Sequence, residues 1–298
     1  MSTSKKPVPE KGWMRALIFL VVFSGIYLLG LWLYSQTTLN VTIGPVFAGT
    51  AIFAFATLVT LPVFRALIDK KSLTSIGFRW KLPGNDPVYG SNLRLIAVLM
   101  AMAILGVGWI TLYFTNDLEY HGAMLSPQNL STGFILMCVI AIAEEAVFRG
   151  YILNNLLDSF SPWLALITSA MLFAFLHSGN PEAGMLALFN VFLAGIFLGI
   201  SYIYTHNLWF AIFFHLSWNF LQGPVLGFPV SGLELPALFQ VTISGNELIT
   251  GGKFGFEASI IQTVLFIIAS LALYLYYRNQ FPSSLTDIHN SQKEQAKY

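Results

Sequence analysis

Long apolar segments recur along the whole chain and restrict it to a small number of possible folds. A helix needs about 20 predominantly apolar residues to cross the hydrocarbon core of a bilayer, and only helices or closed barrels satisfy their backbone hydrogen bonds there. The sequence therefore predicts an all-α fold, a polytopic membrane bundle of about eight transmembrane helices. The predicted spans cover roughly residues 14–34, 44–64, 93–114, 132–157, 162–177, 184–205, 207–226 and 258–277.

The composition agrees with a membrane protein and excludes other classes. Hydrophobic residues make up 56% of the chain and charged residues only 10%, whereas ordinary soluble domains are about 25% charged. The net charge of +1 gives no basic excess, so no nucleic-acid partner is expected. The single cysteine, Cys138, allows neither an intramolecular disulfide nor a thiolate metal cluster.

Basic residues gather on one side of this predicted bundle. Cytoplasmic loops of membrane proteins carry an excess of Lys and Arg, which places both termini in the cytoplasm here. Residues 1–13 then form a cytoplasmic N-terminus, residues 14–278 the transmembrane bundle and residues 279–298 a cytoplasmic tail. The brevity of the chain and its polar tail favour a bacterial protein, so we expect a multi-pass protein of the bacterial cytoplasmic membrane. The basic residues on this side are Lys5, Lys6, Lys11, Arg15, Arg65, Lys70, Lys71, Arg79, Lys81, Arg94, Arg278, Lys293 and Lys297.

Two acids and one base lie inside the fourth predicted span. A charge near the bilayer centre costs at least ~2.5–3.5 kcal/mol, so such residues are candidates for a functional site. Glu145 and Arg149 are four residues apart on one helical face, so they can pair and lower the cost of burial. Glu144 points about 100° away from that face and has no helical partner. An unpaired carboxyl in a dry site can act as an acid or a base.

Two further polar motifs lie in neighbouring spans. His177 follows Phe173 by four residues at the end of the fifth span, and Asn219 follows His215 by four residues in the seventh. Glu144 and His177 each lie about 16 residues, or roughly 24 Å, from the turn between their spans. Antiparallel helices would therefore bring them to the same depth in the membrane.

These residue types favour hydrolysis. Glu144 and His177 could hold and deprotonate a water molecule, while His215 and Asn219 donate hydrogen bonds to the oxyanion of a tetrahedral intermediate. The set Glu144, His177 and His215 could instead bind zinc, although no His is followed by Glu, so the HExxH motif is absent. Phe173 is expected to pack beside His177. Each motif alone is also compatible with a structural ion pair or a core histidine.

Three smaller features carry expectations about packing. The GxxxG pattern from Gly195 to Gly199 allows close helix approach, and we expect it to act within the chain rather than in a dimer. Asn190 lies in the middle of the sixth span, where it is expected to satisfy a backbone group. The Gly- and Pro-rich loop 223–257 could cover the outer mouth of the site or merely connect two spans.

At these motifs the chain resembles the CPBP family, the CAAX-prenyl-processing endopeptidases and their bacteriocin-processing and immunity homologues, also called Abi proteins. That family shows Glu-Glu-xxx-Arg, then Phe-xxx-His, then His-xxx-Asn. The same order stands here at Glu144 to Arg149, at Phe173 to His177 and at His215 to Asn219. The resemblance covers about 132–226.

The resemblance implies an intramembrane endopeptidase that cleaves a membrane-associated, prenylated or leader-type peptide. Glu144 and His177 then look like the water-activating pair and His215 and Asn219 like the oxyanion pair. Glu145, Arg149 and Phe173 look like supporting residues. Family members have been described both as metalloproteases and as metal-independent glutamate proteases, so zinc stays open. The expected partners are the lipid bilayer and a peptide or membrane-protein substrate. The alternatives are a non-catalytic immunity or scaffold protein and an ion- or proton-coupled transporter.

Overall fold

The structure, a computed structural model, describes residues 7–37, 44–80 and 87–280. Almost all of its regular elements are helices, with one small antiparallel sheet. The helices and strands are α1 (Gly12–Ser35), α3 (Pro45–Val63), η1 (Phe64–Ile68), η2 (Leu73–Ile76), α4 (Pro87–Phe114), β1 (Leu118–Ala123), α5 (Pro127–Glu145), η3 (Ala146–Leu153), α6 (Asn154–Leu157), α7 (Pro162–Leu176), η4 (His177–Gly179), α8 (Met185–Thr205), α9 (Trp209–Phe220), η5 (Leu221–Val225), β2 (Phe239–Ile243), α10 (Glu247–Thr250), η6 (Gly252–Phe254), η7 (Phe256–Ala258) and α11 (Ile260–Gln280).

Seven helical segments of the described residues are long and apolar enough to cross a membrane. They confirm an all-α, polytopic membrane bundle. The predicted boundaries agree to within a few residues at most ends. The segments are Gly12–Ser35, Pro45–Ile68, Asn92–Phe114, Pro127–Leu157, Pro162–Gly179, Met185–Thr205 and Ile260–Gln280.

The seventh predicted span, 207–226, forms a shorter helix and is not among these segments. α9 has 12 residues and continues into the five-residue π-helix η5, which together span about 25 Å. His206 at a φ of 47° ends α8 in the left-handed conformation, and the side chain of Asn207 accepts a hydrogen bond from the amide of Trp209 at 2.9 Å. Pro224 limits continuation at the other end because it lacks a backbone donor. α9 is therefore an inner helix, in contact with α4, α5 and α8.

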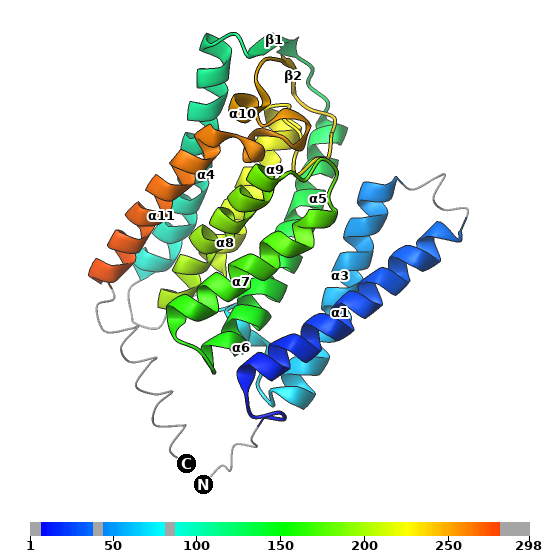
Figure 1. Cartoon of the computed structure of the whole chain (residues 1–298), viewed down its shortest axis with the longest axis vertical. Helices are drawn as coiled ribbons and strands as arrows, with labels where there is room; N and C mark the ends of the chain where they lie inside the picture. Colours follow the sequence, from blue (N-terminus) through cyan, green and yellow to red (C-terminus); the bar gives the residue numbers. More distant parts are fainter. Residues whose placement is uncertain (1–6, 38–43, 81–86, 281–298) are drawn as a thin grey trace.

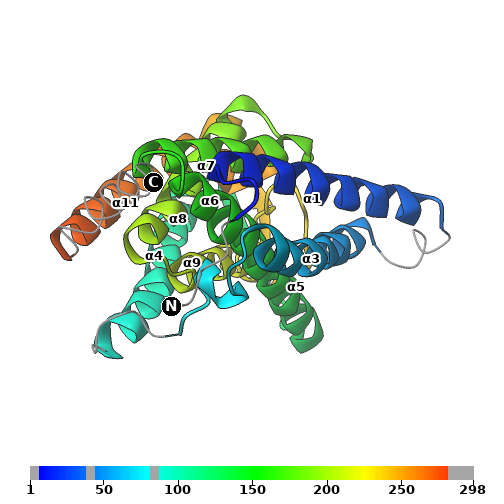
Figure 2. The same ribbon diagram turned by 90° about the horizontal axis from the view of Figure 1, so that it is seen from below.

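The helices form a main body and a projecting pair. α8 contacts α7, α9 and α11, and α9 contacts α4 and α5, so α8 and α9 lie at the centre of the body (Figure 1). α1 and α3 pack on each other and extend together away from the other helices (Figure 2). Contacts of α1 with α6 and of α3 with α5 join this pair to the body.

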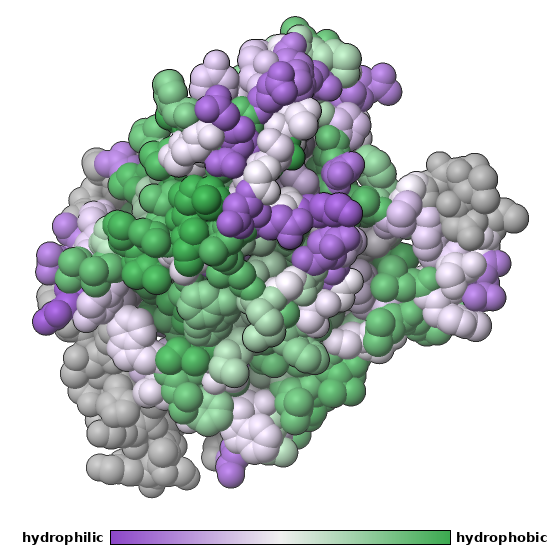
Figure 3. All heavy atoms as spheres, turned by 45° about the horizontal axis from the view of Figure 1, so that its top comes forward, coloured by the Kyte–Doolittle hydropathy of each residue, from purple (hydrophilic) through white to green (hydrophobic). Residues whose placement is uncertain are grey.

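The two ends of the bundle differ in charge and structure. The start of α1 and the end of α11 lie at the same end, and the β1–β2 sheet lies at the other (Figure 1). This arrangement is the one that two cytoplasmic termini require, and which side faces the cytoplasm stays a prediction. Residues 1–6 of the predicted N-terminal segment and 281–298 of the predicted tail lie outside the described residues. Hydrophilic residues gather at the sheet end, while hydrophobic residues cover the flanks of the helices (Figure 3).

A buried network of ion pairs joins the projecting pair to the main body at the end of the bundle where α1 begins. The Arg15 Nε lies 3.1 Å from Asp69 Oδ1, and the Arg65 Nη1 lies 2.8 Å from Asp69 Oδ2. Arg15 also pairs with Asp158 and donates a hydrogen bond to Asn155. Arg15, Arg65 and Asp69 are almost fully buried, so the network fixes α1 and η1 against the chain that follows η3.

The GxxxG pattern lies in the contact between α7 and α8. A Cβ added to Gly195 would stand 2.9 Å from the Ala170 Cα, and one added to Gly199 would stand 2.3 Å from the Leu166 Cδ1. Real Cβ atoms almost never approach backbone atoms this closely, so the two helices meet where side chains are missing. The expectation of packing within the chain is confirmed.

Gly195→Ala is expected to destabilise the protein by about 1–3 kcal/mol, since α7 must move to admit the methyl group. Gly25→Ala in α1 is the matched control, because no atom lies within 4 Å of its added Cβ and alanine has the higher helix propensity. Thermal unfolding of both variants in the same detergent measures the difference. Equal stability of the two variants would contradict the close contact.

Candidate active site

The acidic motif lies where α5 changes into a π-helix. α5 ends at Glu145, and η3 continues from Ala146 to Leu153 with all its residues buried. π-helical turns are rare and occur frequently at functional sites. Arg149 lies within η3, and its side chain is buried in the interior of the bundle.

Glu145 connects Arg149 with His215. The Arg149 Nη1 donates to Glu145 Oε1 at 2.8 Å, and the His215 Nδ1 lies 2.9 Å from the same oxygen. Arg149 also reaches the Gly195 carbonyl at 3.3 Å. Glu145 and Arg149 are 0% and 1% exposed, so the predicted ion pair is present and buried. The sequence did not predict the contact with His215. Through this contact Glu145 also orients the His215 ring.

Glu144 has a carboxylate oxygen without a partner. Its Oε2 is buried and has no hydrogen bond among the described residues. It lies 3.9 Å from the Nε2 of His177 and 4.0 Å from the Nε2 of His215. Both distances exceed a hydrogen bond, and one water molecule with bonds of about 2.8 Å would bridge each gap. The motifs therefore meet at the depth that the sequence predicted.

His177 is held by the turn that precedes it. Its Nδ1 lies 2.8 Å from the Phe173 carbonyl oxygen, so Nδ1 carries the proton and Nε2 faces Glu144. The Phe173 ring packs 4.5 Å from the His177 ring, and the Arg149 guanidinium carbon lies 4.4 Å from its centroid on another side. Phe173 packs beside His177, as expected, and it also packs against the guanidinium of Arg149.

Two cavities adjoin these residues. A cleft of about 420 Å³ opens in front of them, between the α1–α3 pair and the helices α5 and α7, and Glu144 lines it. A smaller chamber of about 50 Å³ lies behind them, between α8, α9 and α11. His177, His215 and Asn219 line both spaces, so the candidate residues form the wall that the two cavities share.

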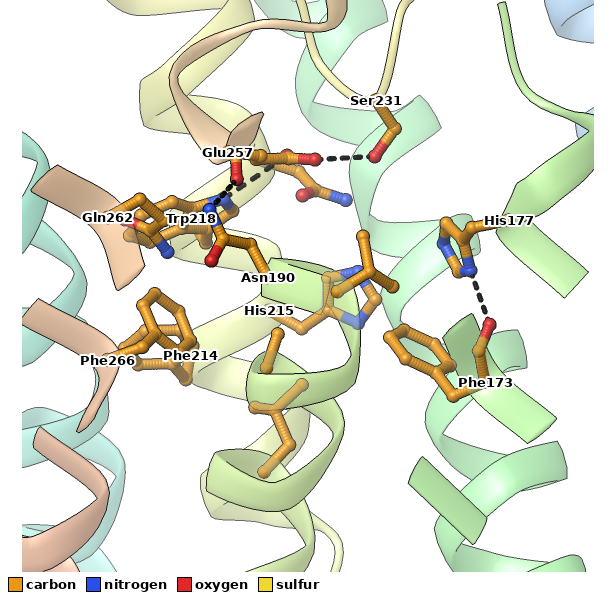
Figure 4. A pocket seen from close by; sticks show the side chains of 14 residues that line it. Phe173, His177, Asn190, Phe214, His215, Trp218, Ser231, Glu257, Gln262 and Phe266 are labelled. Atoms are coloured by element: carbon orange, nitrogen blue, oxygen red, sulfur yellow. Dashed lines mark hydrogen bonds between the residues drawn. The ribbon is translucent and has the colours of Figure 1, made fainter. Parts of the chain in front are cut away.

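Figure 4 shows the chamber behind this wall. His215 lies at its centre, His177 to one side, and Ser231 and Glu257 above them in this view. Glu257 accepts hydrogen bonds from the Ser231 hydroxyl at 2.7 Å, from Gln222 at 3.0 Å and from the Trp218 indole at 3.3 Å. Burial raises the pKa of Glu257, and the hydrogen bonds from Ser231 and Trp218 oppose this shift.

The sequence reasoning missed Glu257 and left the role of its loop open. The loop folds back onto the site rather than merely connecting two spans, because Ser231 and Glu257 both line the chamber. The available signal was weak: an acid in a Gly-rich stretch directly before the last apolar segment. Asn190 bonds the carbonyl oxygens of Glu257 and Ser259 at 2.7 and 2.8 Å, which confirms that it satisfies backbone groups.

A metal centre does not fit the side chains as placed. Within the described ranges, no group of three His, Cys, Asp or Glu side chains could hold a metal ion. Ligands of a tetrahedral zinc lie roughly 3.3 Å apart, whereas the Nε2 atoms of His177 and His215 stand 3.9 and 4.0 Å from Glu144 Oε2.

One comparison with known proteins identifies the central part of the chain. Residues 126–221 match the family described as type II CAAX prenyl endopeptidase Rce1-like. No curated protein sequence matches the chain significantly. The matched segment covers about a third of the chain, from α5 to α9, and contains all three motifs. The chain is therefore a multi-pass membrane protein whose residues 126–221 are similar to the family described as Rce1-like type II CAAX prenyl endopeptidase.

Proposed function

We propose that the chain is an intramembrane endopeptidase in which Glu144 activates a water molecule. The observation that carries this proposal is the buried, unpartnered Oε2 of Glu144 between the Nε2 atoms of His177 and His215. A buried acceptor without a donor invites a water molecule. A carboxylate and an imidazole around one water are the groups that general base catalysis requires.

Glu144 and His177 would hold the attacking water from two sides. Because the Nδ1–H of His177 donates to the Phe173 carbonyl, the Nε2 of the neutral ring can only accept. The water donates one hydrogen to this nitrogen and the other to Glu144, which directs its lone pairs at the substrate carbonyl. Glu144 takes a proton as the oxygen–carbon bond forms.

His215 and Asn219 would stabilise the resulting oxyanion. The His215 Nδ1–H donates to Glu145, so Nε2 can donate only when the ring is an imidazolium. The carboxylate of Glu145 supports this charged form. Asn219, one helical turn later, adds an amide donor on the wall between the cavities. Removing one such donor in other hydrolases typically costs about 10²–10³-fold in kcat.

Breakdown of the intermediate needs no further acid. Glu144 returns the proton to the leaving nitrogen as the carbon–nitrogen bond breaks, and the products are a carboxylic acid and an amine, which become a carboxylate and an ammonium by proton exchange. This scheme assigns Glu145 and Phe173 to positioning because they contact His215 and His177. Arg149 acts through these two residues, which it contacts in turn.

The cleft suggests where the substrate binds. Its walls include Phe23 and Tyr27 of α1, Phe53 of α3 and Met137 and Ile140 of α5. Such a surface suits an apolar chain beside an extended peptide, as in a prenylated peptide or the apolar part of a leader peptide. The description of the matching family, CAAX prenyl endopeptidase, agrees with a lipid-modified substrate.

A cleavage assay tests the proposal. Purified protein in liposomes is incubated with quenched apolar peptides, with and without a prenylated cysteine, and the products are identified by mass. Cleavage at a defined bond supports an endopeptidase. Absence of any product, together with an intact immunity or transport phenotype, would replace it with the scaffold or transporter alternative.

Metal chelators are expected to leave this cleavage unchanged. The reason is the spacing of Glu144, His177 and His215, which suits a water molecule better than a tetrahedral zinc. The rate is measured after dialysis against a chelator and again after zinc is added back. A loss of more than about tenfold, restored by zinc, would contradict this expectation.

A further inference from the structure

The chamber behind the catalytic wall combines hydrogen-bond acceptors with aromatic side chains. Glu257 supplies a carboxylate, and the buried Gln262 Oε1 has no donor among the described residues. Three aromatic side chains surround these acceptors: Phe214, Trp218 and Phe266. Their rings contact one another, with centroids 5.3–6.0 Å apart. Aromatic walls around a carboxylate are typical of sites for organic cations.

Glu257 has hydrogen-bond donors but no cation as partners among the described side chains. It is 8% exposed, and both carboxylate oxygens accept hydrogen bonds, from Trp218 and Gln222 on Oε1 and from Ser231 on Oε2. Among the side chains that the structure describes, no Lys, Arg or His nitrogen forms an ion pair with it. The ionised form of Glu257 is costly to bury without a cation, which agrees with its raised pKa, so a cation that enters the chamber would stabilise that form.

The charges of the whole site also favour a cation in the chamber. Three carboxylates line or adjoin the two cavities, Glu144, Glu145 and Glu257, whereas Arg149 is the one arginine that pairs with any of them in the described residues. The imidazoles of His177 and His215 can balance part of this charge only when protonated. The site therefore has room for one more positive charge, and the acid that pairs with Arg149 is Glu145 rather than Glu257.

The backbone around Glu257 is shaped for this placement. Ser231 adopts a φ of 49° and Gly255 a φ of 108°, conformations that are costly for most residues. A Cβ on Gly255 would stand 2.1 Å from the Pro229 carbonyl oxygen. The glycine thus lets two parts of the loop pass closely, which brings the Ser231 hydroxyl and the Glu257 carboxylate together.

We propose that the chamber is a subsite for a primary ammonium group of the substrate, with Glu257 as its counter-ion. The ammonium belongs either to a lysine side chain next to the scissile bond or to the amino terminus that cleavage releases. This inference rests on the proposed endopeptidase function, since it places the subsite directly behind His177, His215 and Asn219.

The size of the chamber predicts which side chains the subsite prefers. A water molecule needs about 10–15 Å³ of such space, so about 50 Å³ accommodates an ammonium group, which is similar in size to water, and a few water molecules. The planar guanidinium of arginine is larger and offers its donors in a rigid fork. We therefore expect lysine to be preferred over both arginine and the neutral, isosteric norleucine.

The first arm of the test measures binding without catalysis. n-Butylammonium, a mimic of the lysine side chain, is added to the full-length protein in detergent, with n-butanol as the neutral comparison. The ammonium is expected to raise the Tm of the wild type by about 2–4 °C and to leave Glu257→Gln unchanged. Glu234→Gln, at an exposed acid of the same loop, is the matched control and should respond like the wild type.

The second arm measures cleavage. Peptides with lysine, arginine or norleucine on either side of the scissile bond are compared by kcat/KM, and Glu257→Gln is expected to remove a lysine preference of about tenfold or more. Short product peptides with a free or an acetylated amino terminus are compared as inhibitors. A lysine preference identifies the side chain as the occupant, and stronger inhibition by free amino termini identifies the product.

The two arms separate the failure of each proposal. Stabilisation by n-butylammonium without cleavage of any peptide would support the subsite and contradict the protease. Cleavage with no lysine preference, no inhibition by free amino termini and no stabilisation would overturn the subsite and leave a water-filled chamber. An identical response of wild type and Glu257→Gln to n-butylammonium would overturn it as well.

Discussion

Glu144→Gln is expected to lower kcat by at least about 10³-fold, the scale of a positioned general base together with the proton that it delivers to the leaving group. Glutamine keeps the size of the side chain but cannot accept the proton of the attacking water. Stability should hardly change, because Glu144 Oε2 has no hydrogen bond to lose within the described residues. The kcat of the variant in the peptide assay and its Tm in detergent are the two measurements.

A control separates the chemistry from a general loss of negative charge. Glu182→Gln removes an exposed acid from the segment that follows His177, and it should keep wild-type activity. A Glu144→Gln variant that retains activity within about tenfold of the wild type would remove Glu144 from the mechanism. A normal Tm with lost activity is the result that only a chemical role explains.

Glu145→Leu is expected to destabilise the protein by about 3–5 kcal/mol, the usual cost when a buried ion pair loses one partner. Arg149 would remain in the interior, with the Gly195 carbonyl as its remaining polar contact. The double variant Glu145→Leu/Arg149→Met should recover most of this loss, because well-packed apolar residues can replace a buried pair. Thermal unfolding of both variants in one detergent tests this.

The double variant should nevertheless be inactive. His215 loses the carboxylate that holds its Nδ1, so its Nε2 is no longer directed and charged for the oxyanion. Recovery of stability without recovery of kcat is the expected pattern, with a loss of at least about 10²-fold. If the double variant cleaved like the wild type, Glu145 would serve only as a partner of Arg149.

Helical periodicity predicted those site contacts that lie within one helix or at one depth. The spacing of Glu145 and Arg149 gave the ion pair now seen at 2.8 Å. Equal distances from the turn near 160–161 brought Glu144 and His177 to one level, where they are 3.9 Å apart. Both predictions depend only on the rise and the pitch of a helix.

Contacts that depend on the rotation of one helix against another were not predictable in this way. The hydrogen bond between His215 and Glu145 forms only if α9 turns the face that carries His215 toward α5. The sequence pattern of a strongly apolar helix does not determine which face turns toward which neighbour. The approach of Glu257 to the chamber depends on the fold of a long Gly- and Pro-rich loop. Such loops follow tertiary contacts rather than a period in the sequence.

The position of the α1–α3 pair determines how the concentration of a membrane-anchored substrate should be expressed for this protein. The pair forms one wall of the cleft, and both of its helices cross the bilayer by length and composition. A substrate anchored in the same bilayer reaches such a cleft by lateral diffusion in two dimensions. Its supply then depends on the number of substrate molecules per lipid molecule rather than on molarity, so added lipid dilutes the substrate even when the volume of solution stays fixed.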